Sequence, residues 1–147
     1  MTIAATVARI LLGLTFLAAG IMTLGFIVLN YAPPPQPGLA GQFQTVFFAS
    51  RWVLLVSSVQ VISGVLLLAN RYVTLAITML GAVIANILTY HITLAPSSLP
   101  PALVVTVLWA IVASRYRSSF ARFFTAQPDA KASTRPVPSR AVRVVAA

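Results

Sequence analysis

The sequence predicts an all-α membrane protein, a bundle of four transmembrane helices, and three observations lead to that class. Hydrophobic residues make up 59% of the 147 residues and charged residues only 7%, whereas about 25% of the residues of a soluble domain are charged. The apolar residues gather in four runs, each close to the roughly 20 residues that a helix needs to cross a bilayer. The cations lie at the ends of these runs, between them or after the last one. So few charged groups cannot cover the surface of a soluble domain, which excludes that class.

The four runs define the spans. The first covers residues 10–30, and the second covers residues 52–70 and is cut off by Arg71. The third covers residues 72–94 and the fourth residues 99–116. Because the first run is longer than the 7–15 apolar residues of a signal peptide, we expect it to stay in the protein as a helix.

Ser98 and the prolines that follow mark the start of the fourth span. The Ser98 side chain is expected to cap the helix, and Pro100 and Pro101 fit its first turn, where a missing N–H costs nothing. The loop between the first and second spans opens with a proline cluster that cannot continue a helix. It then carries apolar residues at a spacing typical of a short interfacial helix, with Trp52 as an interface anchor. These apolar residues are Phe43, Val46, Phe47 and Phe48.

The distribution of cations sets the expected orientation. With four spans, the N-terminus, the loop between the second and third spans and the C-terminus lie on one side. That side holds nine of the ten cations, and Arg51 alone lies on the other, so both termini are expected in the cytoplasm. The nine are Arg9, Arg71, Arg115, Arg117, Arg122, Lys131, Arg135, Arg140 and Arg143. Residues 1–124 are then the membrane domain, and residues 125–147 a disordered basic cytoplasmic tail.

Several kinds of active site are excluded by residues that the spans lack. No Asp, Glu, Lys or Arg lies deep in a span, and proton-coupled transporters usually rely on such groups. The single histidine and the absence of cysteine exclude a multi-histidine or thiolate metal site and a bis-histidine haem, so no metal site is expected.

Small residues inside the spans predict close helix packing. Glycine and alanine let helix backbones approach one another in a membrane. We assign this role to Gly13, Gly20, Gly64, Gly81 and Ala85.

A second set of residues offers a binding site for a quinone or another small ligand. His91 lies at the outer end of the third span and could donate a hydrogen bond to a quinone carbonyl or ligate a haem; the alternative is a histidine that only caps the helix end. The set grouped with it is Tyr90, Asn86, Gln60, Arg51 and Trp52. For Gln60 and Asn86, the alternative to ligand binding is a structural role, hydrogen bonding between helices.

Four blocks of sequence resemble the DoxX family of small bacterial membrane proteins. They are RILLGLTFLAAG (9–20), PPPQPGLAGQFQTVFFAS (33–50), QVISGVLLLANRYVTLAITML (60–80) and ANILTYHITLAPSSLPPALV (85–104). The resemblance covers about residues 5–124 and implies a four-helix, multi-pass protein of the bacterial inner membrane. The family takes its name from a subunit associated with a terminal quinol oxidase and thiosulfate:quinone oxidoreduction. Members often carry a glutamate where this chain has Gln60, while Asn86 and His91 fit the family pattern.

Three functions follow as alternatives. The favoured one is a non-catalytic subunit, anchor or small-ligand-binding partner of a membrane complex, with no cofactor and no catalytic residue of its own. The second is a quinone-binding subunit of a membrane oxidoreductase, and the third a transporter of a small neutral solute that works as an oligomer. The expected partners are the lipid bilayer, other membrane or oxidoreductase subunits, or further copies of the chain; nucleic acid is not expected.

Overall fold

The described part of the chain is built from helices. The computed structural model describes residues 3–31, 34 and 36–121, and no β-strand occurs among them. The expected tail, 125–147, lies outside these residues. The helices are α1 (Ile3–Val28), α2 (Gly38–Ala49), α3 (Trp52–Leu68), α4 (Val73–Thr93), the short 3-10 helix η1 (Pro96–Ser98), α5 (Leu99–Arg115) and α6 (Arg117–Ala121).

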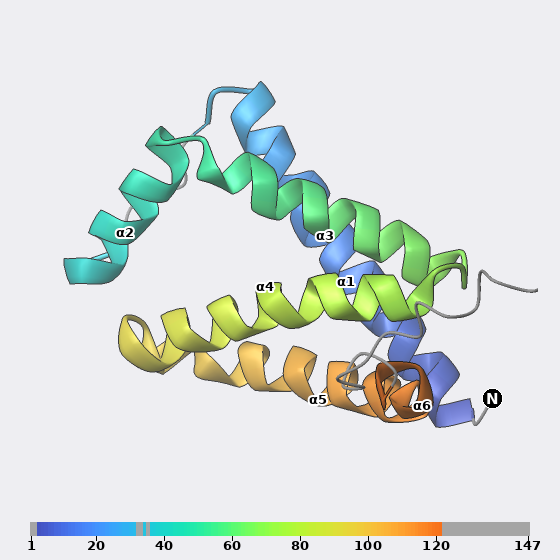
Figure 1. Ribbon diagram of the computed structural model, residues 1–147. Coiled ribbons are helices and arrows are strands. Elements are labelled where there is room, and N and C mark those ends of the chain that lie inside the picture. The colour runs from blue at the N-terminus through green and yellow to red at the C-terminus, as the bar shows by residue number, and fades with distance from the viewer. Residues whose placement is uncertain (1–2, 32–33, 35, 122–147) are drawn as a thin grey trace, which may run out of the picture.

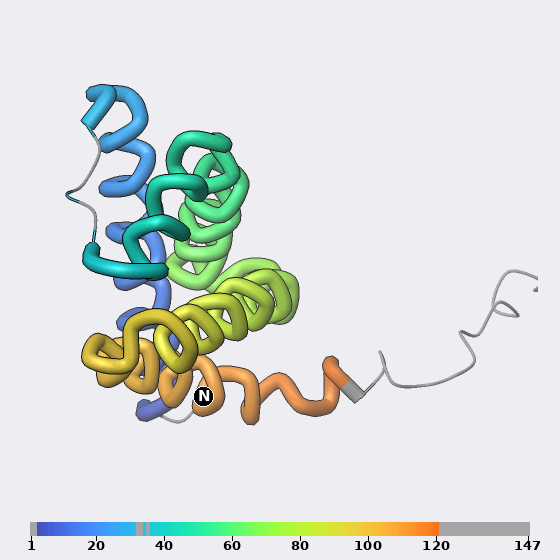
Figure 2. Tube along the Cα trace, turned by 90° about the vertical axis from the view of Figure 1, so that its left-hand side faces the viewer, coloured from blue at the N-terminus to red at the C-terminus, as the bar shows by residue number. Residues whose placement is uncertain are grey.

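The four long helices form a ring in which each packs against two others. α1 packs along α3, α3 contacts α4, α4 contacts α5, and α5 returns to α1. One end of the bundle, here called the N-terminal end, carries the start of α1, the α3–α4 turn and the end of α5 (Figure 1). The opposite end, here called the α2 end, carries α2 and the turn from α4 into α5; Figure 2 views the bundle from that side.

Three helices are long and apolar enough to cross a membrane on their own: α1, α4 and the continuous η1–α5 segment. α3 has 17 residues, about 26 Å of helix, which is slightly less than the roughly 30 Å of hydrocarbon in a bilayer. It reaches membrane length only together with α2, and these two helices meet at an angle of 82°. The structure therefore contains three to four helices of membrane-spanning length.

Asparagines end two of the helices. Asn30 and Asn70 adopt left-handed backbone conformations, with φ of 52° and 54°. The amide of the following residue then donates to a carbonyl one turn back: Tyr31 N to Phe26 O at 2.8 Å, and Arg71 N to Leu66 O at 3.1 Å. This pattern satisfies carbonyls that would otherwise be unpaired at a helix C-terminus.

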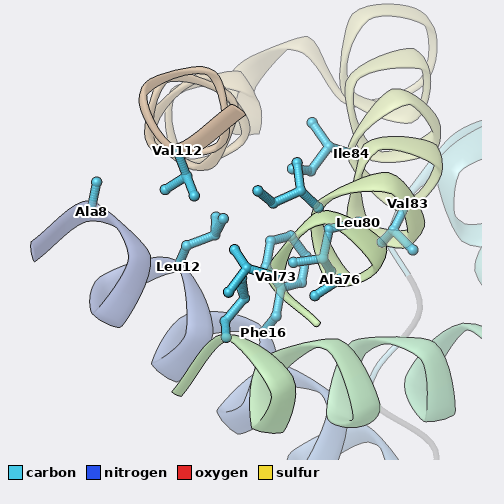
Figure 3. Packing of buried hydrophobic residues seen from close by; sticks show 11 residues of the cluster. Ala8, Leu12, Phe16, Val73, Ala76, Leu80, Val83, Ile84 and Val112 are labelled. Atoms are coloured by element: carbon cyan, nitrogen blue, oxygen red, sulfur yellow. The ribbon is translucent and has the colours of Figure 1, made fainter. Parts of the chain in front are cut away.

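The hydrophobic core lies toward the N-terminal end of the bundle. Leu12 and Phe16 of α1 meet Leu80 of α4 and Val112 of α5, and all four are almost completely buried. Figure 3 shows these side chains converging from the three helices.

The first helix differs from the expected span. α1 begins at Ile3 rather than at residue 10, and Arg9 lies inside it with only 7% of its surface exposed. The charge of Arg9 suggested a residue at the membrane surface. The spacing shows why it is buried, because Arg9 falls four residues after Ala5 and three before Leu12, on the face that packs into the bundle.

Candidate functional site

Tyr90 and His91 lie together at the α2 end of the bundle, where α2 contributes aromatic rings. The Tyr90 ring lies 5.4 Å from the ring of Phe43 and 5.2 Å from that of His91, measured between centroids. Phe43 stacks on Phe47 at 5.7 Å, and Phe47 meets Phe48 edge to face at 6.2 Å. We call these five residues the aromatic cluster. It joins α2 to the end of α4, through residues that are more than 40 positions apart in the sequence.

His91 is held by the turn that follows its own helix. Its Nδ1 lies 2.9 Å from Ser98 Oγ, and the Ser98 hydroxyl lies 3.0 Å from the carbonyl of Ala95. If the hydroxyl donates to Ala95, then Nδ1 carries a proton and donates to the hydroxyl oxygen. In that arrangement Nε2 is the acceptor nitrogen of the neutral ring.

Ser98 stands at the expected N-cap position of α5, but its side chain makes no cap hydrogen bond there. The short η1 helix places the hydroxyl next to His91 and Ala95 instead. The expected capping role of the Ser98 side chain is therefore wrong.

The remaining ligand candidates do not join the aromatic cluster. Asn86 is exposed on α4, and its amide donates to the Ala82 carbonyl of its own helix at 3.0 Å. Gln60 is half-buried in α3, and Arg51 and Trp52 are exposed at the corner between α2 and α3. Arg51 meets the cluster through its backbone amide, which donates to the Phe48 carbonyl at 3.1 Å. Of the six candidates, the structure brings Tyr90 and His91 into contact.

Most hydroxyls in the long helices bond to their own helix. Thr15, Thr23 and Ser57 each donate to the carbonyl four residues earlier, at 2.8 Å. The hydroxyls of Thr78, Thr89, Thr93 and Thr106 do the same at 2.7–2.9 Å. Two buried oxygens in the described chain have no partner, Ser63 Oγ in α3 and Gln44 Oε1 in α2. These polar groups are thus spread along the helices rather than gathered at one point.

Glycines of α1 and α3 lie at close contacts between these two helices. A methyl group at Gly20 would lie 2.9 Å from the Ser57 carbonyl oxygen, and one at Gly64 would lie 2.9 Å from the Gly13 carbonyl oxygen. A methyl at Gly13 would lie 3.0 Å from Leu68.

The other two packing positions lie on α4. Gly81 lies under the ring of Trp109 of α5, with 3.1 Å between the Trp109 Cζ2 and the position of an added methyl. Trp109 Nε1 also donates to the Ile77 carbonyl at 2.9 Å, which ties α5 to α4. Ala85 lies on the exposed side of α4.

Arg9 is the polar residue that the pattern of charges did not single out. Its Nη1 donates to the carbonyl of Leu67 in the last turn of α3, while its Nε is buried without a partner. A cation at a helix C-terminus is favourable, because the carbonyls there carry partial negative charge. Ion pairs are absent from the described residues, and the only acid of the chain, Asp129, lies outside them. The spacing from Ala5 and Leu12 was the signal that could have revealed this residue.

Among residues 3–31 and 36–121, no three histidine, cysteine or acidic side chains come together as a metal site would need. No family model, no curated protein and no solved structure matches the chain. The resemblance to the DoxX family therefore stays a prediction from the quoted blocks.

Proposed function

We propose that this chain is a four-span protein of the inner membrane, of the DoxX type, which acts as a non-catalytic subunit or anchor in a membrane complex. The observation that carries the proposal is the dispersal of the polar groups. Most hydroxyls in the long helices bond to their own backbone, whereas a catalytic site needs several polar groups aimed at one reacting atom.

The packing of α3 against α1 supports the fourth span. Gly64 and Gly20 mark contacts between the two helices that are far apart along both of them. α3 therefore runs beside α1, and it would share the membrane depth of any span that α1 makes. A helix of 17 residues lies at the lower limit of length for a span.

The ends of the bundle carry the residues expected at the two membrane surfaces. Tyr31 and Trp52 are exposed at the α2 end and Tyr72 at the N-terminal end, as in the aromatic belts of membrane proteins. Among the described cations, Arg9, Arg71, Arg115 and Arg117 lie toward the N-terminal end and Arg51 toward the α2 end. This asymmetry supports a cytoplasmic N-terminal end.

Photocrosslinking in native membranes tests the role as a subunit. A photoreactive phenylalanine analogue replaces Leu14, which is 51% exposed on α1, and separately replaces Leu12 of the same helix, which is 0% exposed. We expect the Leu14 variant to give a discrete crosslink to another protein and the Leu12 variant to give none. A set of variants at Leu14, Leu55 and Val107 that yields no crosslinked protein would contradict the proposal, because these exposed positions sample α1, α3 and α5.

A second function, quinone binding at the α2 end, is favoured by the aromatic cluster. Tyr90 and Phe43 offer ring faces on which a planar ring can stack. His91 offers a nitrogen beyond the one held by Ser98. The Tyr90 hydroxyl can donate a hydrogen bond to a quinone carbonyl, and Nε2 of His91, the acceptor nitrogen in the arrangement described above, can accept one from the hydroxyl of the quinol form.

Titration of the purified protein with a short-chain quinone separates the two functions. If the cluster binds the quinone, His91→Ala and Phe43→Ala should each weaken binding, and Trp52→Ala, outside the cluster, should not. Equal quinone affinity in the parent protein and the His91→Ala variant would rule this second function out.

A further inference from the structure

The exposed face of α4 differs from the exposed faces of the other long helices. α1, α3 and α5 expose large aliphatic side chains along their lengths. In α4, all of which is described, no large hydrophobic side chain is exposed between Leu75 and Ile92. The exposed residues on this stretch are Thr78, Ala82, Ala85, Asn86 and Thr89.

Asn86 is the polar group on this face that its own helix cannot satisfy. The hydroxyls of Thr78 and Thr89 each donate their one hydrogen to a carbonyl of α4, at 2.9 Å. The Asn86 side-chain amide donates one of its two hydrogens to the Ala82 carbonyl, and its second hydrogen is left without an acceptor. Its Oδ1 accepts no hydrogen bond from a described residue, and hydrocarbon offers no donor. A membrane-spanning α4 therefore needs a polar partner at this position.

The spacing of residues around Asn86 matches a helix-pairing seam. Along one side of α4, from Leu75 to Thr93, six residues follow one another at intervals that alternate between four and three. This is the 3.5-residue repeat of two helices wound around each other. Asn86 falls inside the seam, and a polar Asn at such a position fixes the register of a helix pair. The seam is formed by Leu75, Met79, Ala82, Asn86, Thr89 and Thr93, all exposed except the half-buried Met79.

We propose that this face of α4 packs against α4 of a second copy of the chain. The proposal rests on the membrane-spanning function proposed above. Two copies inserted with the same orientation place their α4 helices in parallel, so a two-fold axis brings Asn86 against Asn86. Each carboxamide then donates its spare hydrogen to the Oδ1 of the other, which uses the one donor and the one acceptor left over.

A second copy fits this face better than a different protein because the face is self-complementary. This face carries no charged residue, so two identical copies of it can pack together without charge repulsion. Ala82 allows the backbones to approach closely, as small residues do between membrane helices. Two-fold pairs of this kind are the commonest form of oligomer.

Disulfide crosslinking tests the pairing, because the chain has no cysteine of its own. Ala82→Cys places a thiol in the seam. Val107→Cys, on the exposed face of α5, is a matched control. Each position lies about 12–14 Å along its helix from the N-terminal end, so both thiols react at a similar depth. The full chain is oxidised in native membranes, and the products are separated by mass.

We expect Ala82→Cys to form a product of twice the 15.6 kDa chain mass and Val107→Cys to remain monomeric. Adding Asn86→Leu should raise the dimer dissociation constant about five- to thirty-fold, and Asn86→Gln, which keeps the carboxamide, should restore much of the pairing. Equal crosslinking at both positions, a crosslink to a chain of another mass, or no effect of Asn86→Leu would each overturn the proposal.

The same membranes separate this proposal from the one on which it rests. Alkaline carbonate strips peripheral proteins and leaves spanning proteins in the pellet. Release of the chain by carbonate would contradict the membrane-spanning function itself. Retention of the chain together with a monomeric Ala82→Cys variant would contradict only the pairing.

Discussion

Arg9 is a charged residue buried in a bundle of apolar helices, with no acidic side chain beside it among the described residues. Its guanidinium donates to the Leu67 carbonyl at the end of α3, and the amide of Asn70 shares that carbonyl at 3.2 Å. The long side chain also fills space between helices, because only 7% of its surface is exposed. Arg9 therefore holds α1 to the turn between α3 and α4.

Replacing Arg9 with alanine should destabilise the protein. Arg9→Ala removes a charged hydrogen bond and buried contacts, and we expect a loss of about 2 kcal/mol of unfolding free energy. Thermal unfolding in detergent measures it. Arg71→Ala is the matched control, because Arg71 is exposed at the same end of the bundle and should change stability by less than about 0.5 kcal/mol. Equal unfolding temperatures for the two variants would contradict the role of Arg9.

At the scale of helices, α1 and α3 depend on glycines that have no room for a side chain. A methyl group at Gly64 would lie 2.9 Å from the backbone of Leu17 and from the Gly13 carbonyl oxygen. Backbone atoms cannot rotate away, so the two helices would have to separate. Gly25, in the same α1 helix, has no atom within 4 Å of an added methyl.

We therefore expect opposite outcomes for two glycine-to-alanine variants. Gly64→Ala should lower the unfolding free energy by about 1–3 kcal/mol through overpacking. Gly25→Ala should leave it unchanged or raise it slightly, because alanine favours helix. Thermal unfolding of both variants in the same detergent makes the comparison. A Gly64→Ala variant as stable as the parent would show that the two helices are not in close contact.

The sequence predicted the helix boundaries well where short-range chemistry sets them. Asn30 and Asn70 end their helices through left-handed conformations, and α5 starts at Leu99 as the Ser98–Pro100 signal indicated. The expected short helix in the first loop is α2 (Gly38–Ala49). The contact of Phe43 with Tyr90 was beyond such reasoning, because it depends on the 82° corner at Arg51 and on how α2 folds back over α4.

At the scale of the whole molecule, composition indicated the class of protein more clearly than the site. Apolar runs show which segments suit a membrane, and the helices of the structure agree with them in number to within one span. The site depends on which polar groups meet in space. Of the six ligand candidates, the neighbours Tyr90 and His91 meet, because Asn86 points out of the bundle and Arg51 lies at a corner.

The central claim, four spans with both termini in the cytoplasm, is tested most directly by the sidedness of two reporters. One reporter is fused after Ala147, and a second, in another variant, is inserted next to Gln36, between α1 and α2. We predict a cytoplasmic reporter at Ala147 and an external one at Gln36. An external reporter at Ala147 with an external one at Gln36 would mean an odd number of spans, with α3 outside the membrane, and would contradict the claim.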